Sequence, residues 1–198
     1  MNYLKRTSNF FNDESESTDF DKVFEEVVVT WRKKHKKEES HLTKALAEAI
    51  EMRNDDTGFH AKSEAWIQRD SITYGAIDIL LTPEQKVSDT ASTPLAVIEV
   101  GRNGSRWWRK LDQNLKYLAN MGSHQRDIRL EFTEPLLMVV LTIEGEGEGV
   151  DVKFEVRLGV FLCAPKSSTS IDDYRMSLLW HSRTNDLTEA SRDFGRLI

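Results

Sequence analysis

Apolar residues recur at helical spacing in two stretches near the start of the chain. The first stripe predicts a helix that begins near Thr18 and runs into a basic segment, residues 32–37. The second predicts a helix that follows Ser40 and is ended by residues 54–58. Positions three and four residues apart share one face of a helix. The two stripes are Phe20, Val23, Phe24, Val27, Val28 and Trp31, and then Leu42, Ala45, Leu46, Ala49 and Ile50.

From residue 61 onward the pattern is mostly that of strands. The run at 95–100 is apolar around a single acid, which is typical of a strand buried on both faces. A helix is predicted at 105–121, with Trp108, Leu111, Leu115 and Leu118 as its core stripe. We expect it to form a crossover between two strands of one sheet. Strands are predicted at 61–68, 71–81, 95–100, 135–143, 150–164 and 174–181, and a closing helix at 188–197.

This order of elements predicts the α/β class, with a mixed β-sheet flanked by helices. The length of 198 residues fits one domain, expected at 20–198 after a flexible acidic lead at 1–19. No apolar run is long enough to cross a membrane, so no membrane partner is expected. Cys163 is the only cysteine, which excludes an internal disulfide and fits the cytosol or the nucleus.

Two acids interrupt apolar strands. Asp78 stands in the segment 75–81, and Glu99 stands in the segment 95–101. A lone carboxylate in such a place is costly to bury unless it is paired or bound to a metal. Either acid could instead point to solvent from one strand face. Their occurrence on strands that are expected to be adjacent favours a shared site for a hard cation such as Mg²⁺.

The helix that follows places four polar side chains on one face, next to its apolar stripe. Lys110, Gln113, Asn114 and Tyr117 fall at i, i+3, i+4 and i+7. A helix that starts just after Glu99 can aim this face at the carboxylates. The alternative is an ordinary solvated face of an amphipathic helix.

The net charge of −6 argues weakly against a protein coated with positive charge, but bases cluster locally. The segment 101–117 holds five bases against one acid, and we expect nucleic-acid contacts from it. The segment 32–37 is interpreted as a nuclear-localisation or phosphate-contacting patch, or alternatively as a solvated helix end. The expected nucleic-acid contacts are Arg102, Arg106, Arg109, Lys116 and a base-stacking Trp107, with burial of the Trp107 ring as the alternative. The localisation bases are Arg32, Lys33, Lys34, Lys36 and Lys37.

Three features form a recognisable series along the chain. They are Asp78, the segment Ile98-Glu99-Val100, and the segment 113–117 with Gln113 and Tyr117. This series resembles the RecB-type branch of the PD-(D/E)XK nucleases. The segment 101–118 is more similar still to the nuclease-like C-terminal domains of Crinkler effectors from oomycetes and fungi. The resemblance covers residues 39–117 at most. It implies a restriction-endonuclease-like fold, Mg²⁺ or Mn²⁺ as cofactor, and DNA rather than RNA as substrate.

The resemblance also assigns roles. Asp78, Glu99 and the carbonyl of Val100 correspond to the metal ligands, and Gln113 and Tyr117 to the conserved helix pair. Glu39 corresponds to the acid of the first helix, as a further metal ligand, although Glu48 and Glu51 compete with it. Glu64 is a further candidate ligand.

One position departs from the family pattern: Gly101 stands where the family has its lysine. Arg102 is one residue away and should point to the opposite side of a strand. Lys110 is the better substitute because it shares a helix face with Gln113, and Lys116 is a third candidate.

These observations predict a metal-dependent nuclease acting on DNA, as an effector or toxin module in the nucleus, including a host nucleus, or otherwise in the cytoplasm. The alternative is a catalytically degenerate domain that binds nucleic acid or a host nuclear protein. A purely structural use of the fold is a third interpretation.

Overall fold

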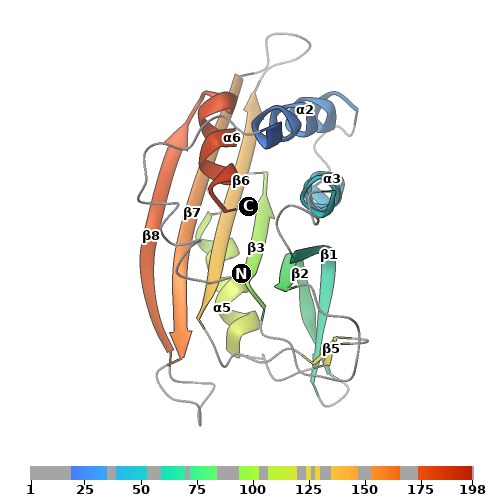
Figure 1. The fold of residues 1–198 in the computed structure, drawn as a ribbon, viewed down its shortest axis with the longest axis vertical. Helices are drawn as coiled ribbons and strands as arrows, with labels where there is room; N and C mark the ends of the chain where they lie inside the picture. The colour runs from blue at the N-terminus through green and yellow to red at the C-terminus, as the bar shows by residue number, and fades with distance from the viewer. Residues whose placement is uncertain are drawn as a thin grey trace.

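The computed structural model describes residues 19–34, 39–52, 59–69, 72–83, 94–102, 107–119, 124–125, 128–129, 135–146, 153–165 and 174–197. The predicted lead at 1–19 lies outside these residues, apart from Asp19, where the first helix begins. The helices are α2 (Asp19–Lys34), α3 (Glu39–Glu51), α5 (Trp107–Ala119) and α6 (Leu187–Gly195) (Figure 1). The strands are β1 (Phe59–Arg69), β2 (Ile72–Pro83), β3 (Ala96–Gly101), β4 (His124–Gln125), β5 (Ile128–Arg129), β6 (Leu136–Glu146), β7 (Lys153–Pro165) and β8 (Tyr174–Thr184).

The strands form one sheet in the order β5-β4-β1-β2-β3-β6-β7-β8. β3 and β6 are parallel, and every other neighbouring pair is antiparallel. The predicted α/β class and mixed sheet are therefore confirmed, and α5 connects the two parallel strands as expected. β4 and β5 were not predicted, because strands of two residues are too short to show an alternating pattern.

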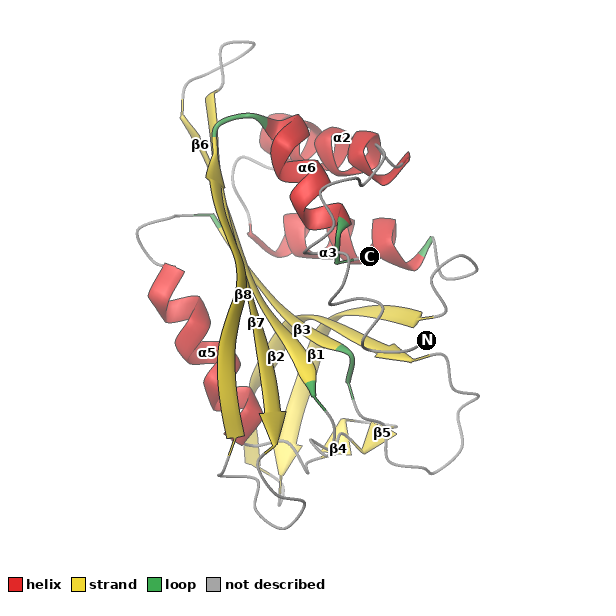
Figure 2. Cartoon of the chain, turned by 60° about the vertical axis from the view of Figure 1, so that its left-hand side comes forward, coloured by secondary structure: helices red, strands yellow, loops and turns green. Residues whose placement is uncertain are grey.

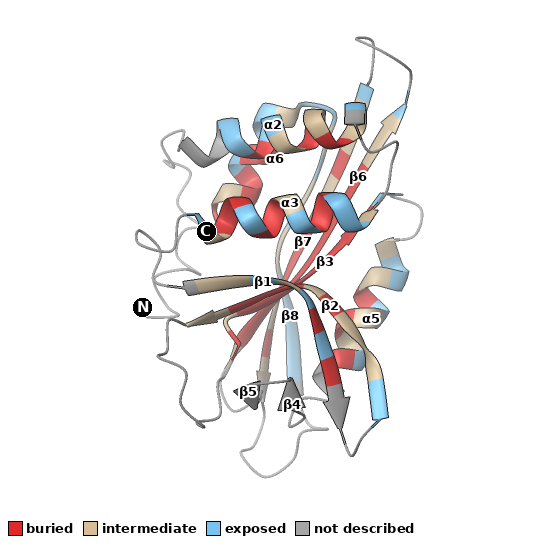
Figure 3. Cartoon of the chain, turned by 90° about the vertical axis from the view of Figure 1, so that its right-hand side faces the viewer, coloured by how far each residue is buried: buried red, intermediate tan, exposed pale blue. Residues whose placement is uncertain are grey.

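Helices cover both faces of the sheet. Among the described helices, α5 packs on one face, while α2, α3 and α6 gather on the other (Figure 2). Each face has its own apolar cluster, and α3 turns its buried side to the sheet (Figure 3). Every residue of β3 is buried, Glu99 included, as predicted from an apolar run around a single acid. Within the described part of the chain, no helix has both the length and the apolar character needed to cross a membrane.

Candidate active site

Asp78 and Glu99 lie on adjacent strands, β2 and β3, as predicted, and their polar groups interlock. The backbone N–H of Asp78 donates to Oε1 of Glu99 at 3.3 Å. The N–H of Val100 donates to Oδ2 of Asp78 at 2.8 Å. Each carboxylate therefore accepts a hydrogen bond from the strand that carries the other one. This exchange fixes both side chains at the centre of the sheet, on its α5 face.

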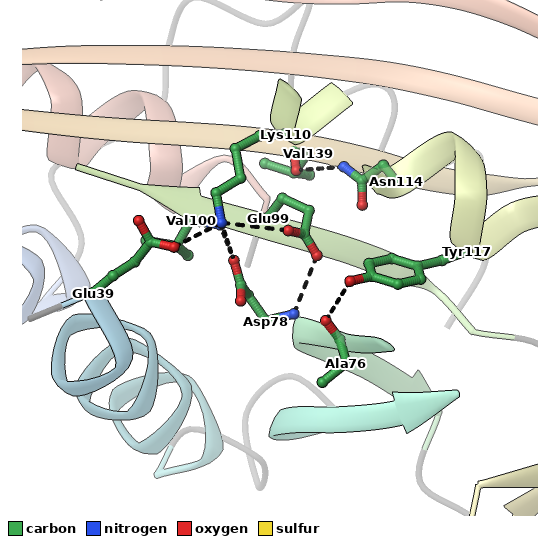
Figure 4. A network of polar contacts seen from close by, with 9 residues as sticks. All are labelled: Glu39, Ala76, Asp78, Glu99, Val100, Lys110, Asn114, Tyr117 and Val139. Atoms are coloured by element: carbon green, nitrogen blue, oxygen red, sulfur yellow. Dashed lines mark hydrogen bonds and ion pairs between the residues drawn. The ribbon is translucent and has the colours of Figure 1, made fainter. Parts of the chain in front are cut away.

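Lys110 extends from α5 to these carboxylates (Figure 4). Its Nζ lies 2.8 Å from Oε1 of Glu39, 3.1 Å from Oδ2 of Asp78 and 3.6 Å from Oε2 of Glu99. Glu39 is in the first turn of α3, so the ammonium joins two helices and two strands that are distant in sequence. The structure thus brings together four residues that the sequence nominated for one site.

The stem of Lys110 occupies the space that a side chain at position 101 would need. A β-carbon added to Gly101 would lie 3.4 Å from Cε and 3.5 Å from Cγ of Lys110. It would also lie 3.2 Å from Cγ2 of Thr142. The glycine and the lysine therefore complement each other: the absent side chain on β3 makes room for the one that arrives from α5.

Two other residues of the same helix face dock α5 on the sheet. Asn114 donates from Nδ2 to the carbonyl of Val139 at 3.0 Å, and Tyr117 donates from its hydroxyl to the carbonyl of Ala76 at 2.6 Å. The tyrosine is only 3% exposed, and its ring lies over Gly75, whose φ of 140° suits glycine. In this structure the Tyr117 hydroxyl holds the helix beside Asp78. Gln113, the other half of the pair, is partly exposed and lies near Tyr117.

Burial dominates the electrostatics of the site. It raises the pKa of Glu99 to about 9, with a further contribution from the negative charge of Asp78, against the opposing effect of Lys110. Burial alone would lower the pKa of Lys110, but Asp78, Glu39 and Glu99 together raise it above its ordinary value. Burial, with the neighbouring Glu99 next, also raises the pKa of Tyr117 to about 12. Lys110 is therefore a permanent cation at neutral pH.

The donor set can be tested against a divalent cation. Oε2 of Glu99 is fully buried and has no hydrogen-bond partner among the described residues. If Glu39, Asp78 and Glu99 all ionise, they exceed the single charge of Lys110 by two, which a divalent cation would balance. Carboxylate oxygens are also the ligands that Mg²⁺ prefers. In the described residues, however, no three His, Cys, Asp or Glu side chains already form a group that could hold a metal ion. Asp78 and Glu99 offer oxygens of the kind that such an ion takes, and the ammonium of Lys110 lies against both carboxylates.

The other nominated acids lie away from this cluster. Oε1 of Glu51 is 2.8 Å from Nδ1 of His60, and Glu48 lies beside Lys44 at 3.9 Å on the surface of α3. Glu64 has a positive φ of 52° on β1, and its side chain is exposed. Of the three competing helix acids, Glu39 is the one that the structure places at Lys110.

The two tryptophans correct the sequence interpretation. Trp108, predicted in the core, is 69% exposed. Trp107, predicted to stack on a base, packs inward: a β-carbon on Gly159 would lie 2.5 Å from its ring. Its centroid is 5.8 Å from that of Phe161, and its Nε1 is buried. The helix is rotated by about one residue relative to the predicted stripe, so its core face contains Lys110 and Asn114 as well as leucines.

The predicted basic contacts are only partly described. Arg102, Arg109 and Lys116 are exposed, whereas Arg106 lies outside the described residues. Of the localisation patch, Arg32 and Lys33 lie on the last turn of α2. The side chain of Lys34 and all of Lys36 and Lys37 fall outside the described part.

Comparison with protein-family models, with curated proteins and with solved structures finds no match to this chain.

The buried carboxyl of Glu99 predicts a gain in stability when its charge is removed. Glu99→Gln should raise the free energy of unfolding by about 1–3 kcal/mol at neutral pH in a chelating buffer, because the ionisable group resists burial. Thermal or urea unfolding, beside the exposed Glu48→Gln as control, measures this. Destabilisation by Glu99→Gln alone would mean that the ionised carboxylate holds the strands together.

Proposed function

We propose that this chain is a PD-(D/E)XK-type nuclease, with a restriction-endonuclease-like sheet, that cleaves DNA with Mg²⁺ or Mn²⁺. The observation that carries the proposal is the position of Lys110. Its ammonium lies within 3.6 Å of carboxylate oxygens of Glu39, Asp78 and Glu99, on two adjacent strands and a helix. That is the combination of groups that phosphodiester hydrolysis needs: anionic oxygens for a cation, and a fixed positive charge.

In this proposal Lys110 takes over the task of the strand lysine that Gly101 lacks. The stem of Lys110 fills the space above Gly101, so its ammonium approaches the carboxylates from nearly the same side as a lysine at 101 would. Its raised pKa keeps it protonated. It therefore stabilises the negative charge that develops on the phosphate and does not act as a base.

Asp78 and Glu99 would hold the cation, with the carbonyl of Val100 as a further oxygen. When bound, Mg²⁺ or Mn²⁺ supplies Lewis-acid polarisation of the phosphate and lowers the pKa of a coordinated water. The hydrogen bond from Val100 N–H to Asp78 orients the carboxylate before any ligand arrives. Glu39 holds the ammonium from the opposite side at 2.8 Å.

Tyr117 and Asn114 act indirectly, because their hydrogen bonds to the carbonyls of Ala76 and Val139 hold α5 against the sheet. Gln113, Arg102 and Arg109 are proposed to contact the phosphate backbone. The exposed Trp108 replaces Trp107 as the ring available to a base.

The biological setting is part of the same proposal. The similarity of the segment 101–118 to Crinkler effector domains, and the five bases of the segment 32–37, support action in a nucleus, as an effector or toxin module. DNA or a host nuclear protein would be the partner there.

The test is a cleavage assay with purified full chain on plasmid and linear DNA. We expect cleavage with Mg²⁺ or Mn²⁺ and none when a chelator removes the metal. Asp78 and Glu99 then hold no divalent cation that could bind the phosphate. A folded protein that cleaves neither DNA nor RNA with any of these ions would overturn the nuclease proposal.

The second candidate is a catalytically degenerate member of the same fold that binds nucleic acid or protein. It is favoured by the contacts of Lys110, whose ammonium already lies against carboxylate oxygens of Glu39, Asp78 and Glu99, where a metal ion would have to compete with it. Salt-dependent DNA binding without cleavage, unaffected by Asp78→Asn, would support this candidate.

A further inference from the structure

Lys110 and Glu39 come from helices on opposite faces of the sheet, yet their charged groups are in contact. α3 carries Glu39 in its first turn, and α5 carries Lys110 on the other face (Figure 2). The two side chains meet at the end of β3, where the stem of Lys110 lies against Gly101, the last residue of that strand. The ammonium is therefore held from both faces, and the side chain of Lys110 is only 13% exposed.

The ammonium divides its contacts between the helix and the sheet. Nζ donates to Oε1 of Glu39 at 2.8 Å and to Oδ2 of Asp78 at 3.1 Å (Figure 4). Its third contact, at 3.6 Å from Oε2 of Glu99, is electrostatic and is not a hydrogen bond. Asp78 and Glu99, the two acids of the sheet, therefore share one positive charge, and Glu39 holds that charge from the other side.

Binding of a divalent cation would use the same two acids of the sheet. Two cations that share anionic partners repel each other, and water screens this repulsion little because the side chain of Glu99 is fully buried. Neither carboxylate is free to turn aside, since the N–H of Val100 fixes Asp78 and the N–H of Asp78 fixes Glu99. The movable partner is Lys110, whose charge is at the end of a flexible four-carbon stem.

We propose that Lys110 competes with the divalent cation for Asp78 and Glu99, so that its ammonium leaves both carboxylates when the cation binds. The inference rests on the proposed nuclease function and adds to it a control of metal affinity. Glu39 belongs to α3 and not to the sheet, so it still offers the ammonium an anionic partner after Asp78 has been given up. The displaced ammonium is then available to a phosphate. Lys110 therefore weakens metal binding while it accelerates cleavage.

The experiment measures metal binding apart from cleavage. The affinity of the full chain for Mn²⁺ is measured at neutral pH without DNA, by titration calorimetry and by the electron paramagnetic resonance signal of free Mn²⁺. Lys110→Met should bind Mn²⁺ roughly 10- to 100-fold more tightly than wild type, because a positive charge beside two poorly screened carboxylates is removed. Loss of packing alone would weaken binding, so a purely structural role of Lys110 does not produce this gain.

The matched control is Lys44→Met, which removes a lysine charge from the exposed surface of α3. It should change the Mn²⁺ affinity by less than about twofold, since solvent screens an exposed charge. Lys110→Gln removes the same charge as Lys110→Met and should also tighten binding, so a folding defect peculiar to one variant does not decide the result. Adding Asp78→Asn to Lys110→Met should remove the gain, because the carboxylate that both cations use has then lost its charge.

The outcomes separate this proposal from the nuclease function. If Lys110→Met and Lys110→Gln fold but bind Mn²⁺ no more tightly than wild type, the competition is overturned, and cleavage by wild type would leave the nuclease standing. Tighter binding by both variants, without any cleavage by wild type, supports the competition and overturns the nuclease. No binding of Mn²⁺ by wild type or by either variant overturns the competition.

Discussion

Asp78→Asn should reduce metal-dependent DNA cleavage by on the order of 10³-fold, and Lys110→Met by at least about 10²-fold. Asparagine keeps an oxygen that can accept the 2.8 Å hydrogen bond from Val100, so the strand pairing survives while the negative charge is removed. Methionine keeps much of the lysine stem over Gly101 but removes the ammonium. Initial rates on plasmid DNA with Mg²⁺, together with circular dichroism of each variant, measure these effects.

Two exposed residues supply the controls for charge change alone. Asp112 lies on the exposed surface of α5 and Lys44 on that of α3, so Asp112→Asn and Lys44→Met each change a surface charge. Both should retain cleavage within about twofold, since an exposed charge contributes little to a buried site. If Lys110→Met cleaves at the wild-type rate while Asp78→Asn does not, the site is real but the role of Lys110 is wrong.

The architecture followed from periodicity because long elements carry strong patterns. The fully buried strand β3 could be recognised from six residues, since a run whose single polar position is Glu99 has almost no polar surface to present to water. β4 and β5 were missed because two residues carry no period.

The site was predicted only where the motif and the topology agreed. Asp78 and Glu99 interrupt apolar strands, so their positions were fixed by the strands themselves. Glu39 could not be chosen over Glu48 and Glu51 from sequence, because all three acids lie on the same short helix. Only the helix's position against Lys110 separates them, and that position is a tertiary property.

Two errors have a common physical origin. Trp107 and Trp108 were exchanged because the apolar stripe of α5 was followed through its leucines. The core face also includes polar residues that bind the sheet, such as Asn114, and these rotate the buried arc toward Trp107.

The complementarity of Gly101 and Lys110 leads to a stricter test, in which the lysine is returned to the strand. Lys110→Ala should abolish most of the activity, and adding Gly101→Lys to it should recover cleavage to within about tenfold of wild type. The φ of Gly101 is outside the left-handed region, so its backbone accepts a side chain. Removing Lys110 beyond Cβ clears its Cε and Cγ, and Cγ2 of Thr142, at 3.2 Å from the new β-carbon, must then shift by a few tenths of an ångström.

The same substitution in the presence of Lys110 should be harmful. Gly101→Lys alone adds a stem to occupied space and a second ammonium to one site, which we expect to cost about 1–3 kcal/mol in the free energy of unfolding. Gly101→Met/Lys110→Ala supplies the matched control, with a stem of similar shape and no charge. This methionine variant should fold as Gly101→Lys/Lys110→Ala (the lysine pair) does, but it should remain inactive. Equal rates for the methionine and lysine pairs, both folded, would mean that no ammonium is needed beside Asp78 and Glu99. Recovery by the lysine pair alone would show that cleavage depends on where the charge lies and not on which element carries it.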